Sequence, residues 1–254
     1  MNILADPKTI KIAQQCGISI SNLSHSIGEK SLFSDFSLSL QEHRIGLIGR
    51  NGSGKSTLSR IMCGLIEPKA GNVLVNGVDV FKDRAAAIAT IGIIFQNPDH
   101  QIIFPSVEEE IAFGLESLLG SRKLAREKAR AFLEDFGLLS WAERGTDALS
   151  QGQRHLVCLM SVLAMEPGVI VLDEPFAGLD LPTSRKLFAR LEQLEQQLVL
   201  VTHDFEHLKQ FDRIIWIEHG QLVQDGRPEE VLPAYREAME KLAIADDIEI
   251  GETL

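Results

Sequence analysis

The chain has 254 residues, of which 44% are hydrophobic, and it carries a net charge of −11 at pH 7. A chain of this length and composition can bury a sizeable core, which excludes a disordered protein. The negative charge argues against nucleic acid or an anionic lipid surface as the main partner, because both attract basic patches.

The first quarter of the chain predicts antiparallel strands and then a strand, a glycine-rich loop and a helix. We expect residues 1–17 to form an N-terminal extension, and the alternating apolar residues of 18–40 to form antiparallel β structure. The apolar run 43–48 predicts a buried strand. Residues 57–64 show helical spacing, with Gly64 as the stop.

The middle of the chain predicts a hairpin and a helical insert. Residues 72–80 alternate around Asn76-Gly77, a strong hairpin signal. Residues 106–165 show helical spacing, and Ser106 with Glu109 predicts a capping box at their start. We therefore expect an inserted α-helical subdomain at about 97–165.

The second half of the chain predicts a return to buried strands. The apolar runs 169–172 and 198–201 predict parallel strands, separated by a helix. A closing hairpin is predicted around His219-Gly220, and Pro228 is suited to the first position of a last helix. One α/β domain over 18–232 is thus expected, followed by a C-terminal helix and acidic tail over 233–254.

A phosphate loop is predicted at 49–57, where Gly-Arg-Asn-Gly-Ser-Gly-Lys-Ser-Thr lies between a buried strand and a helix. Its glycines let backbone N–H groups surround phosphates, and the helix N-terminus adds partial positive charge. Lys55 is expected to reach the terminal phosphates, Ser56 to ligate Mg²⁺ and Thr57 to contact the first phosphate. The expected ATP-binding set is Gly49, Asn51, Gly52, Ser53, Gly54, Lys55, Ser56 and Thr57. A flexible glycine turn is the alternative, but a turn needs no Gly-Lys-Ser triplet.

Two carboxylates follow the buried run 169–172, at the sheet edge where α/β proteins bind ligands. We expect Asp173 to hold the water shell of Mg²⁺ and Glu174 to act as general base on the attacking water. The alternative is a buried strand that meets solvent at an acidic turn.

A second anion-binding helix N-terminus is predicted at residues 150–153, called the signature segment below. Ser150 and Gln153 are in capping-box register before a long apolar helix, and the Gly152 backbone and the helix dipole favour anions. One chain then has one phosphate loop but two helix N-termini that favour phosphate. A symmetric dimer, in which the second end faces the partner's nucleotide, explains this best. A well-capped core helix is the alternative.

In the order and spacing of these motifs the chain resembles ABC ATPases over roughly residues 18–232. The resemblance implies an α/β fold: a P-loop NTPase (RecA-like) core with an antiparallel β subdomain and an inserted α-helical subdomain. It implies that Gln96 senses magnesium and the membrane partner, that His203 contacts the terminal phosphate, and that Asp180 lies on a loop across the dimer. Taken singly, Gln96 or His203 would more often be a structural polar residue. The implied catalytic residues are Glu174, His203 and Gln96, the implied Mg²⁺ ligands are Ser56, Gln96 and Asp173, and the signature residues are Ser150, Gln151, Gly152 and Gln153.

The segment 95–114 closely resembles energy-coupling-factor ATPases, which drive uptake of vitamins and of cobalt or nickel ions. In that family the region lines the groove for helices of the transmembrane coupling protein, although Ile102, Ile103, Phe104 and Phe113 could equally be core residues. Residues 174–180 and 211–217 resemble the ATPase of biotin uptake systems. The resemblance implies ATP and Mg²⁺ as cofactors, a second ATPase subunit (a homodimer, with a heterodimer as alternative), a transmembrane coupling protein and a substrate-binding membrane protein.

Two positions depart from the family pattern. Gln151 replaces the usual glycine of the signature segment, and we expect its side chain to hinder the partner nucleotide and slow hydrolysis. Ile27 stands where an aromatic ring usually stacks on adenine, so base recognition is expected from His25, Phe33 or apolar contact.

The remaining expectations concern location and competing functions. No stretch approaches the ~20 apolar residues that span a bilayer, and no secretion signal is evident, so we expect a soluble protein at the cytoplasmic face of the membrane. The three cysteines lack a CxxC pair, which predicts neither disulfides nor a thiolate metal site. Two alternatives stay open: a soluble ABC ATPase of DNA repair or translation, and a weakly hydrolysing regulatory half of a heterodimeric importer.

Overall fold

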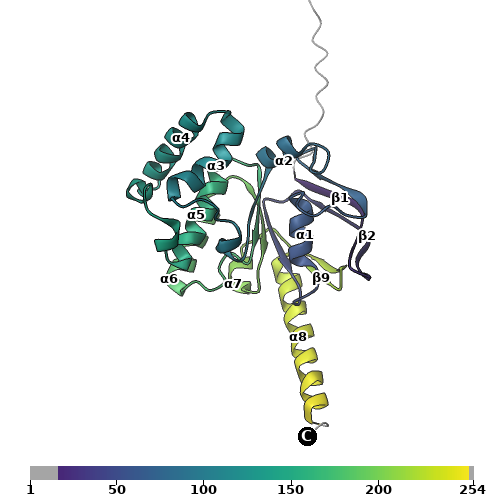
Figure 1. Ribbon diagram of the computed structural model, residues 1–254. Helices are drawn as coiled ribbons and strands as arrows, with labels where there is room; N and C mark the ends of the chain where they lie inside the picture. The colour runs from purple at the N-terminus through teal and green to yellow at the C-terminus, as the bar shows by residue number, and fades with distance from the viewer. Residues whose placement is uncertain (1–16, 252–254) are drawn as a thin grey trace, which may run out of the picture.

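The computed structural model describes residues 17–251, and side chains up to residue 243. It consists of two sheets and a lobe of helices, with one long helix leaving the body (Figure 1). The strands are β1 (Ile18–Ile27), β2 (Lys30–Leu40), β3 (Arg44–Ile48), β4 (Ala70–Val75), β5 (Val78–Asp79), β6 (Ile91–Ile94), β7 (Val169–Asp173), β8 (Gln197–Val201), β9 (Arg213–Glu218) and β10 (Gln221–Gly226). The α-helices are α1 (Lys55–Met62), α2 (Arg84–Thr90), α3 (Val107–Leu119), α4 (Arg122–Asp135), α5 (Gln151–Leu163), α6 (Leu181–Glu192), α7 (Phe205–Leu208) and α8 (Pro228–Gly251).

The antiparallel sheet has the order β2-β1-β4-β5 and confirms the prediction for 18–40. Alternation along β1 buries Ile18, Ile20 and Leu23. The predicted hairpin joins β4 to β5, where Asn76 and Gly77 have φ of 47° and 82°. Positive φ at both positions is what a tight primed hairpin turn requires, and asparagine and glycine tolerate it best.

The larger sheet has the order β10-β9-β3-β8-β7-β6, in which all neighbours except β10 and β9 are parallel. The predicted parallel strands at 169–172 and 198–201 are therefore confirmed as β7 and β8, with α6 between them. Because the strands are parallel, their carboxyl ends meet at one edge. The phosphate loop after β3, Glu174 after β7 and His203 after β8 thus come to the same edge.

Both faces of the larger sheet are covered, which explains why its strands are continuous apolar runs. One face packs with α1 and the antiparallel sheet, burying Ile45, Val171 and Val199 among others. The other face lies under α5, α6, α7 and the start of α8. Alternation decides the face: Ile215 and Ile217 face α1, whereas Ile214 and Trp216 face the opposite layer.

A third core belongs to the helical lobe, formed by α3, α4 and one side of α5. Helix α5 is shared, because Val157 and Met160 pack in the lobe while Leu159 and Leu163 pack on the sheet. The predicted capping box at Ser106 is only half formed. The Ser106 Oγ accepts from the Glu109 N–H, but the Glu109 carboxylate accepts from the Ser106 hydroxyl and from a guanidinium of α4 instead of the Ser106 N–H.

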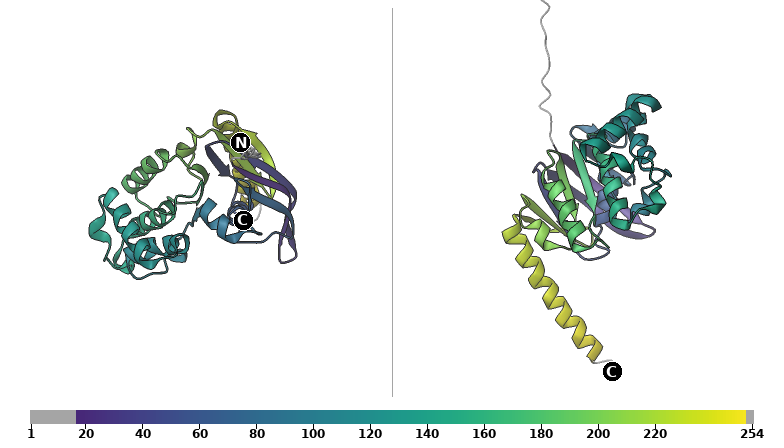
Figure 2. Two further views of the ribbon diagram at one scale, coloured as in Figure 1. Left: turned by 90° about the horizontal axis from the view of Figure 1, so that it is seen from above. Right: turned by 90° about the vertical axis from the view of Figure 1, so that its left-hand side faces the viewer.

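Helix α8 begins at Pro228, as predicted, and continues to Gly251 with Pro233 inside it. Its first turns pack on the larger sheet through Leu232 and Tyr235, and its later turns leave the body (Figures 1 and 2). The expected N-terminal extension lies outside the described residues apart from Gly17. Across residues 17–251, no helix combines the length and the apolarity that a bilayer crossing would demand.

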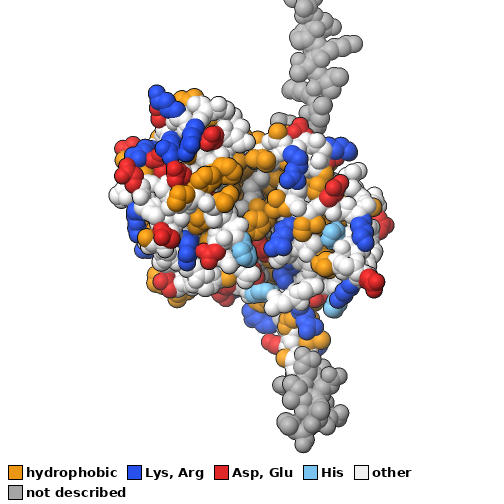
Figure 3. All heavy atoms as spheres, in the orientation of Figure 1, with side chains coloured by type: hydrophobic (Ala, Val, Ile, Leu, Met, Phe, Trp, Pro, Cys, Tyr) orange, Lys and Arg blue, Asp and Glu red, His pale blue; other side chains and the backbone are white. Residues whose placement is uncertain are grey.

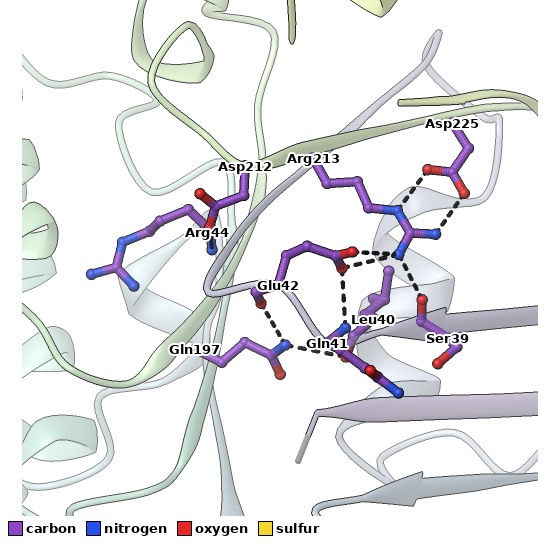
Figure 4. A network of polar contacts seen from close by, with 9 residues as sticks. All are labelled: Ser39, Leu40, Gln41, Glu42, Arg44, Gln197, Asp212, Arg213 and Asp225. Atoms are coloured by element: carbon purple, nitrogen blue, oxygen red, sulfur yellow. Dashed lines mark hydrogen bonds and ion pairs between the residues drawn. The ribbon is translucent and has the colours of Figure 1, made fainter. Parts of the chain in front are cut away.

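An ion-pair network ties the two sheets together at the amino ends of the parallel strands (Figure 4). Arg213, the first residue of β9, donates to the Ser39 carbonyl over 2.9 Å, to the Glu42 carboxylate over 2.9 Å and to the Asp225 carboxylate over 2.6 Å. Gln197 donates to the carbonyls of Leu40 and Glu42 over 3.2 and 2.7 Å. This network lies at the edge opposite the phosphate loop.

Candidate functional site

The phosphate loop depends on glycines whose conformations exclude side chains. Gly49 has φ of 149°, and a Cβ there would collide with the Ile217 carbonyl. Gly54 has φ of 109°, and a Cβ there would lie 2.9 Å from the Phe33 ring. The loop therefore lies directly on β9 and on a buried aromatic ring, with its backbone N–H groups free to form an anion-binding nest.

Lys55 is buried and folds back over the loop. Its Nζ donates to the carbonyls of Gly49 and Arg50 over 2.6 and 2.9 Å. Burial lowers the pKa of Lys55, while the nearby carboxylates of Glu174, Glu218 and Asp173 oppose that shift. A buried ammonium is a concentrated positive charge, the kind of group that binds phosphate oxygens.

Ser56 and Asp173 join the loop to the end of β7. The Ser56 hydroxyl donates to Asp173 Oδ1 over 3.1 Å. Burial raises the pKa of Asp173, opposed by that hydrogen bond and by the charges of Arg60 and Lys55. A hydroxyl and a carboxylate side by side are the hard oxygen donors that Mg²⁺ prefers.

Glu174 has φ of 51°, so the chain turns sharply after β7 and presents this carboxylate to the site. Burial raises the pKa of Glu174, and its Oε1 is buried without a hydrogen-bond partner among the described residues. His203 Nε2 lies 3.2 Å from that oxygen, but the angles are not those of a hydrogen bond. Burial, and then the charge of Lys55, lower the pKa of His203, which favours the neutral imidazole.

These side chains converge on one pocket of about 420 Å³. Of the residues predicted from sequence, it is lined by Asn51, Gly52, Gly54, Lys55, Ser56, Thr57, Gln96, Asp173, Glu174 and His203. Gly49 and Ser53 support the loop from behind, since the Gly49 carbonyl holds Lys55 and the Ser53 carbonyl accepts from the Gly220 N–H over 2.9 Å.

The signature segment and Asp180 do not line this pocket. Ser150 and Gln153 form the predicted capping box of α5, and Asp180 caps α6 by accepting from the Thr183 N–H over 2.7 Å. The two helix starts pack on each other, because a Cβ at Gly152 would lie 2.8 Å from Thr183 Cγ2. Within one chain, the capped start of α5 is thus not part of the pocket around the phosphate loop.

Two aliphatic side chains also line the pocket. Ile27, 61% exposed, and Leu32 line it. Phe33 is buried beneath Gly54 and His25 does not line the pocket. Of the three expectations for base recognition, the structure favours apolar contact.

Sequence patterns missed several supporting residues. Glu218, at the end of β9, accepts from the Arg50 N–H over 2.9 Å and so holds the phosphate loop. Arg60, one turn or so into α1, contributes positive charge to Asp173 and lies over the Phe95 ring. His155 is buried in α5 and contacts the Gln96 carbonyl. No sequence pattern marks these residues, because each acts on a segment remote along the chain.

Comparison with known proteins decides the family. The family described as ABC transporter matches residues 33–177, more than half of the chain. The chain belongs to the ABC transporter family. A biotin transport ATP-binding protein of Rhodobacter capsulatus is 56% identical to this ABC protein over 214 residues, covering 84% of this chain and 92% of the relative. An energy-coupling factor transporter ATP-binding protein of Leuconostoc mesenteroides is 37% identical over 227 residues, covering 84% and 82%.

Solved structures agree with this assignment. The cbiO1 protein of Clostridium perfringens, part of the cbiONQ ABC transporter complex, matches this ABC protein with a TM-score of 0.72 at 26% identity, covering 89% of this chain and 94% of the other. The predicted ABC ATPase fold and the resemblance to energy-coupling-factor ATPases are confirmed. This ABC protein binds and hydrolyses ATP.

Proposed function

We propose that this ABC protein powers an energy-coupling-factor importer of a micronutrient, with biotin as the first candidate. The observation that carries the proposal is the 56% identity to a biotin transport ATP-binding protein over 84% of the chain. The pocket geometry supports the motor role, because it gathers phosphate-binding, metal-binding and basic groups at one sheet edge.

The phosphate end of the pocket is proposed to hold ATP through the loop N–H groups and Lys55. Ser56, Asp173 and Gln96 fit a magnesium site, since the Ser56 and Asp173 oxygens are already 3.1 Å apart. Within residues 17–243, no cluster of three or more His, Cys, Asp or Glu could bind a metal by itself. That suits Mg²⁺, which is commonly held by one or two side chains together with phosphate oxygens. When bound, Mg²⁺ would neutralise charge that develops on the phosphates.

Glu174 is the proposed general base. Its buried, unpartnered Oε1 is free to accept a proton from an attacking water, and its raised pKa makes it a better base than an exposed carboxylate. The neutral imidazole of His203 can donate one hydrogen bond to a phosphate oxygen without repelling Lys55. Both groups follow parallel strands, which fix their positions.

Two chains are proposed to complete each other's sites. The capped helix start of the signature segment does not line its own pocket, so it is available to the nucleotide of a second subunit. A head-to-tail homodimer would then place Ser150 and Gly152 opposite the partner's Lys55. Asp180 lies on the loop between Glu174 and α6, where it would cross that interface.

The membrane partners are proposed to dock in the hollow between the helical lobe and α1–α2, where hydrophobic side chains gather (Figure 3). Ile103 and Phe113 are 70% and 51% exposed, and Ile88 of α2 is 47% exposed, which disfavours a core role for them. We propose that this face receives a transmembrane coupling protein, which in turn binds a substrate-binding membrane protein. The chain would then lie at the cytoplasmic face of the membrane.

Affinity purification from the native host tests this function. A tagged chain, extracted from membranes in mild detergent, should copurify with a small membrane coupling protein and a biotin-binding membrane protein, and its deletion should abolish biotin uptake. A Phe113→Asp variant should lose these partners, whereas Val223→Asp, at an equally exposed site on β10, should keep them. Recovery of only soluble proteins or nucleic acid would favour the repair or translation alternative. Turnover that appears only after a different ATPase subunit is added would favour the regulatory alternative.

A further inference from the structure

His155 is a buried histidine with a carbonyl at each ring nitrogen. It lies on α5, is 1% exposed, and its Nε2 is 3.2 Å from the Gln96 carbonyl, while its Nδ1 is 3.2 Å from the Gln151 carbonyl. A neutral imidazole carries one N–H, so it donates to only one of the two carbonyls at a time.

Hydrogen bonding within α5 determines which of the two carbonyls accepts from the imidazole N–H. The Gln151 carbonyl is the first of α5, so it accepts the helical hydrogen bond from the His155 N–H. Gln96 follows β6 outside regular structure, and among the described residues its carbonyl has no hydrogen-bonding neighbour other than the His155 ring. The tautomer with hydrogen on Nε2 satisfies both carbonyls and ties α5 to the Gln96 segment.

Gln151, one helical turn before His155, contacts a different loop. A Cβ at Gly178 would lie 2.7 Å from Gln151 Nε2 and 3.1 Å from its Oε1, so the Gln151 amide occupies the space over that glycine. Gly178 belongs to the loop 177–180, which ends at Asp180, the cap of α6. The side chain that sequence analysis expected to project at a partner lies instead against its own chain.

We propose that His155 and Gln151 are positioning residues that make the start of α5 a rigid link between the Gln96 segment and the loop 177–180. The inference rests on the ATPase activity of the proposed motor and on no membrane partner. Gln96 lines the nucleotide pocket, so a shift of its backbone on nucleotide binding moves His155, and the same helical turn moves Gly178 and Asp180. The two loops that flank Glu174 thereby move together.

Breaking this link should lower kcat and leave the Kd of ATP unchanged. No residue that lines the chain's own pocket lies on α5, so breaking the link leaves Lys55 and the phosphate loop unchanged. The Ala177 N–H donates to the Glu174 carbonyl over 3.1 Å, so a movement of the loop 177–180 shifts Glu174. A surface ion pair between Arg154 and Asp99, 3.4 Å apart and partly exposed, joins the same elements but adds little.

Two near-isosteric variants test the donor at Nε2. Glutamine places an amide N–H near the position of the histidine Nε2, and asparagine places it near Nδ1. His155→Gln should retain at least half of the wild-type kcat, and His155→Asn should lose about tenfold, with the Kd of ATP within twofold in both. Ser161→Ala, which removes a buried hydroxyl of α5 that contacts neither loop, controls for general weakening of the helix and should keep its kcat.

A double-mutant cycle tests whether the two residues act in one chain of contacts. Gln151→Ala should lower kcat about threefold, and adding it to His155→Asn should cost almost nothing more, because the link is already broken. Hydrogen exchange needs no turnover: ADP binding should change protection of 177–180 in wild type and His155→Gln but not in His155→Asn.

Several results would overturn the inference: an unchanged kcat in His155→Asn, a loss confined to ATP affinity, fully multiplicative effects in the double variant, or unaltered exchange of 177–180. Because all readouts use the purified chain, failure to find membrane partners would count against the importer proposal and leave this test intact.

Discussion

The Ser56 hydroxyl donates to Asp173 Oδ1 over 3.1 Å although 117 positions of sequence separate the two residues. Ser56 lies in the first turn of α1 and Asp173 ends β7, so this one contact connects the phosphate loop to the acidic strand end. Both line the same pocket as Glu174. Any metal bound there would share its coordination between two distant parts of the chain.

Asp173→Asn should raise the Mg²⁺ concentration needed for half-maximal ATPase activity by roughly tenfold or more, because an amide oxygen is a weaker ligand than a carboxylate. Titration of phosphate release against Mg²⁺ measures this. Asp225→Asn, at the opposite edge of the sheet, serves as control. An unchanged Mg²⁺ requirement in Asp173→Asn would remove Asp173 from the metal site.

Glu174→Gln should lower kcat by a factor of about 10²–10⁴, since the amide cannot accept a proton from water. The Kd of ATP should stay within a few-fold, because Lys55 and the loop N–H groups are intact, and ATP-dependent dimers should persist. Single-turnover phosphate release with equilibrium binding separates these quantities. Hydrolysis at the normal rate would show that another group is the base.

The pH dependence of kcat should show one acid limb. Burial raises the pKa of Glu174 above its ordinary 4.5, so the base is ionised at high pH and is lost as pH falls through the raised value. Burial, and then the charge of Lys55, lower the pKa of His203, which moves the ionisation of that imidazole away from pH 7. We expect the midpoint of the Glu174 limb above 4.5 in assays at saturating ATP. A midpoint at or below 4.5 would contradict the assignment.

Ile27→Tyr should tighten ATP binding, because a ring at this pocket-lining position can stack on adenine, which is worth about 1–3 kcal/mol per base. Wild type should discriminate weakly between ATP and GTP, since Ile27 and Leu32 offer no polar group to read the base. Equilibrium binding of fluorescent nucleotides measures both. Val223→Tyr, exposed on β10, controls for added surface area. Equal affinities for wild type and Ile27→Tyr would place the base elsewhere.

Arg213→Met should destabilise the fold by roughly 1–3 kcal/mol, since it leaves the carboxylates of Glu42 and Asp225 without their shared partner (Figure 4). The residues are partly exposed, so the loss stays below that of a fully buried pair. Urea unfolding gives the free energy, and the Kd of ATP should not change because the network lies at the far edge of the sheet. A loss of ATP affinity with unchanged stability would refute the purely structural role.

Sequence alone determined the local elements and the local chemistry. The run 43–48, the glycines of 49–54 and the apolar strand before Asp173 predict their own structures, because alternation, burial and backbone freedom act over a few residues. The strand, glycine-rich loop and helix around 49–57 and the capping box at Ser150 were predicted correctly for this reason. The half-formed capping box at Ser106 shows where prediction from local sequence fails. Glu109 has the right spacing, but a guanidinium of α4 competes for its carboxylate.

Only the tertiary structure decided which distant side chains meet. Glu218 supports Arg50, His155 reaches Gln96, and Phe33 lies beneath Gly54, and no local pattern records these contacts. The direction of Gln151, too, depends on Gly178, a residue in another segment whose missing side chain leaves room for the amide. Local propensity sets each element, whereas packing of elements remote in sequence sets where a side chain points.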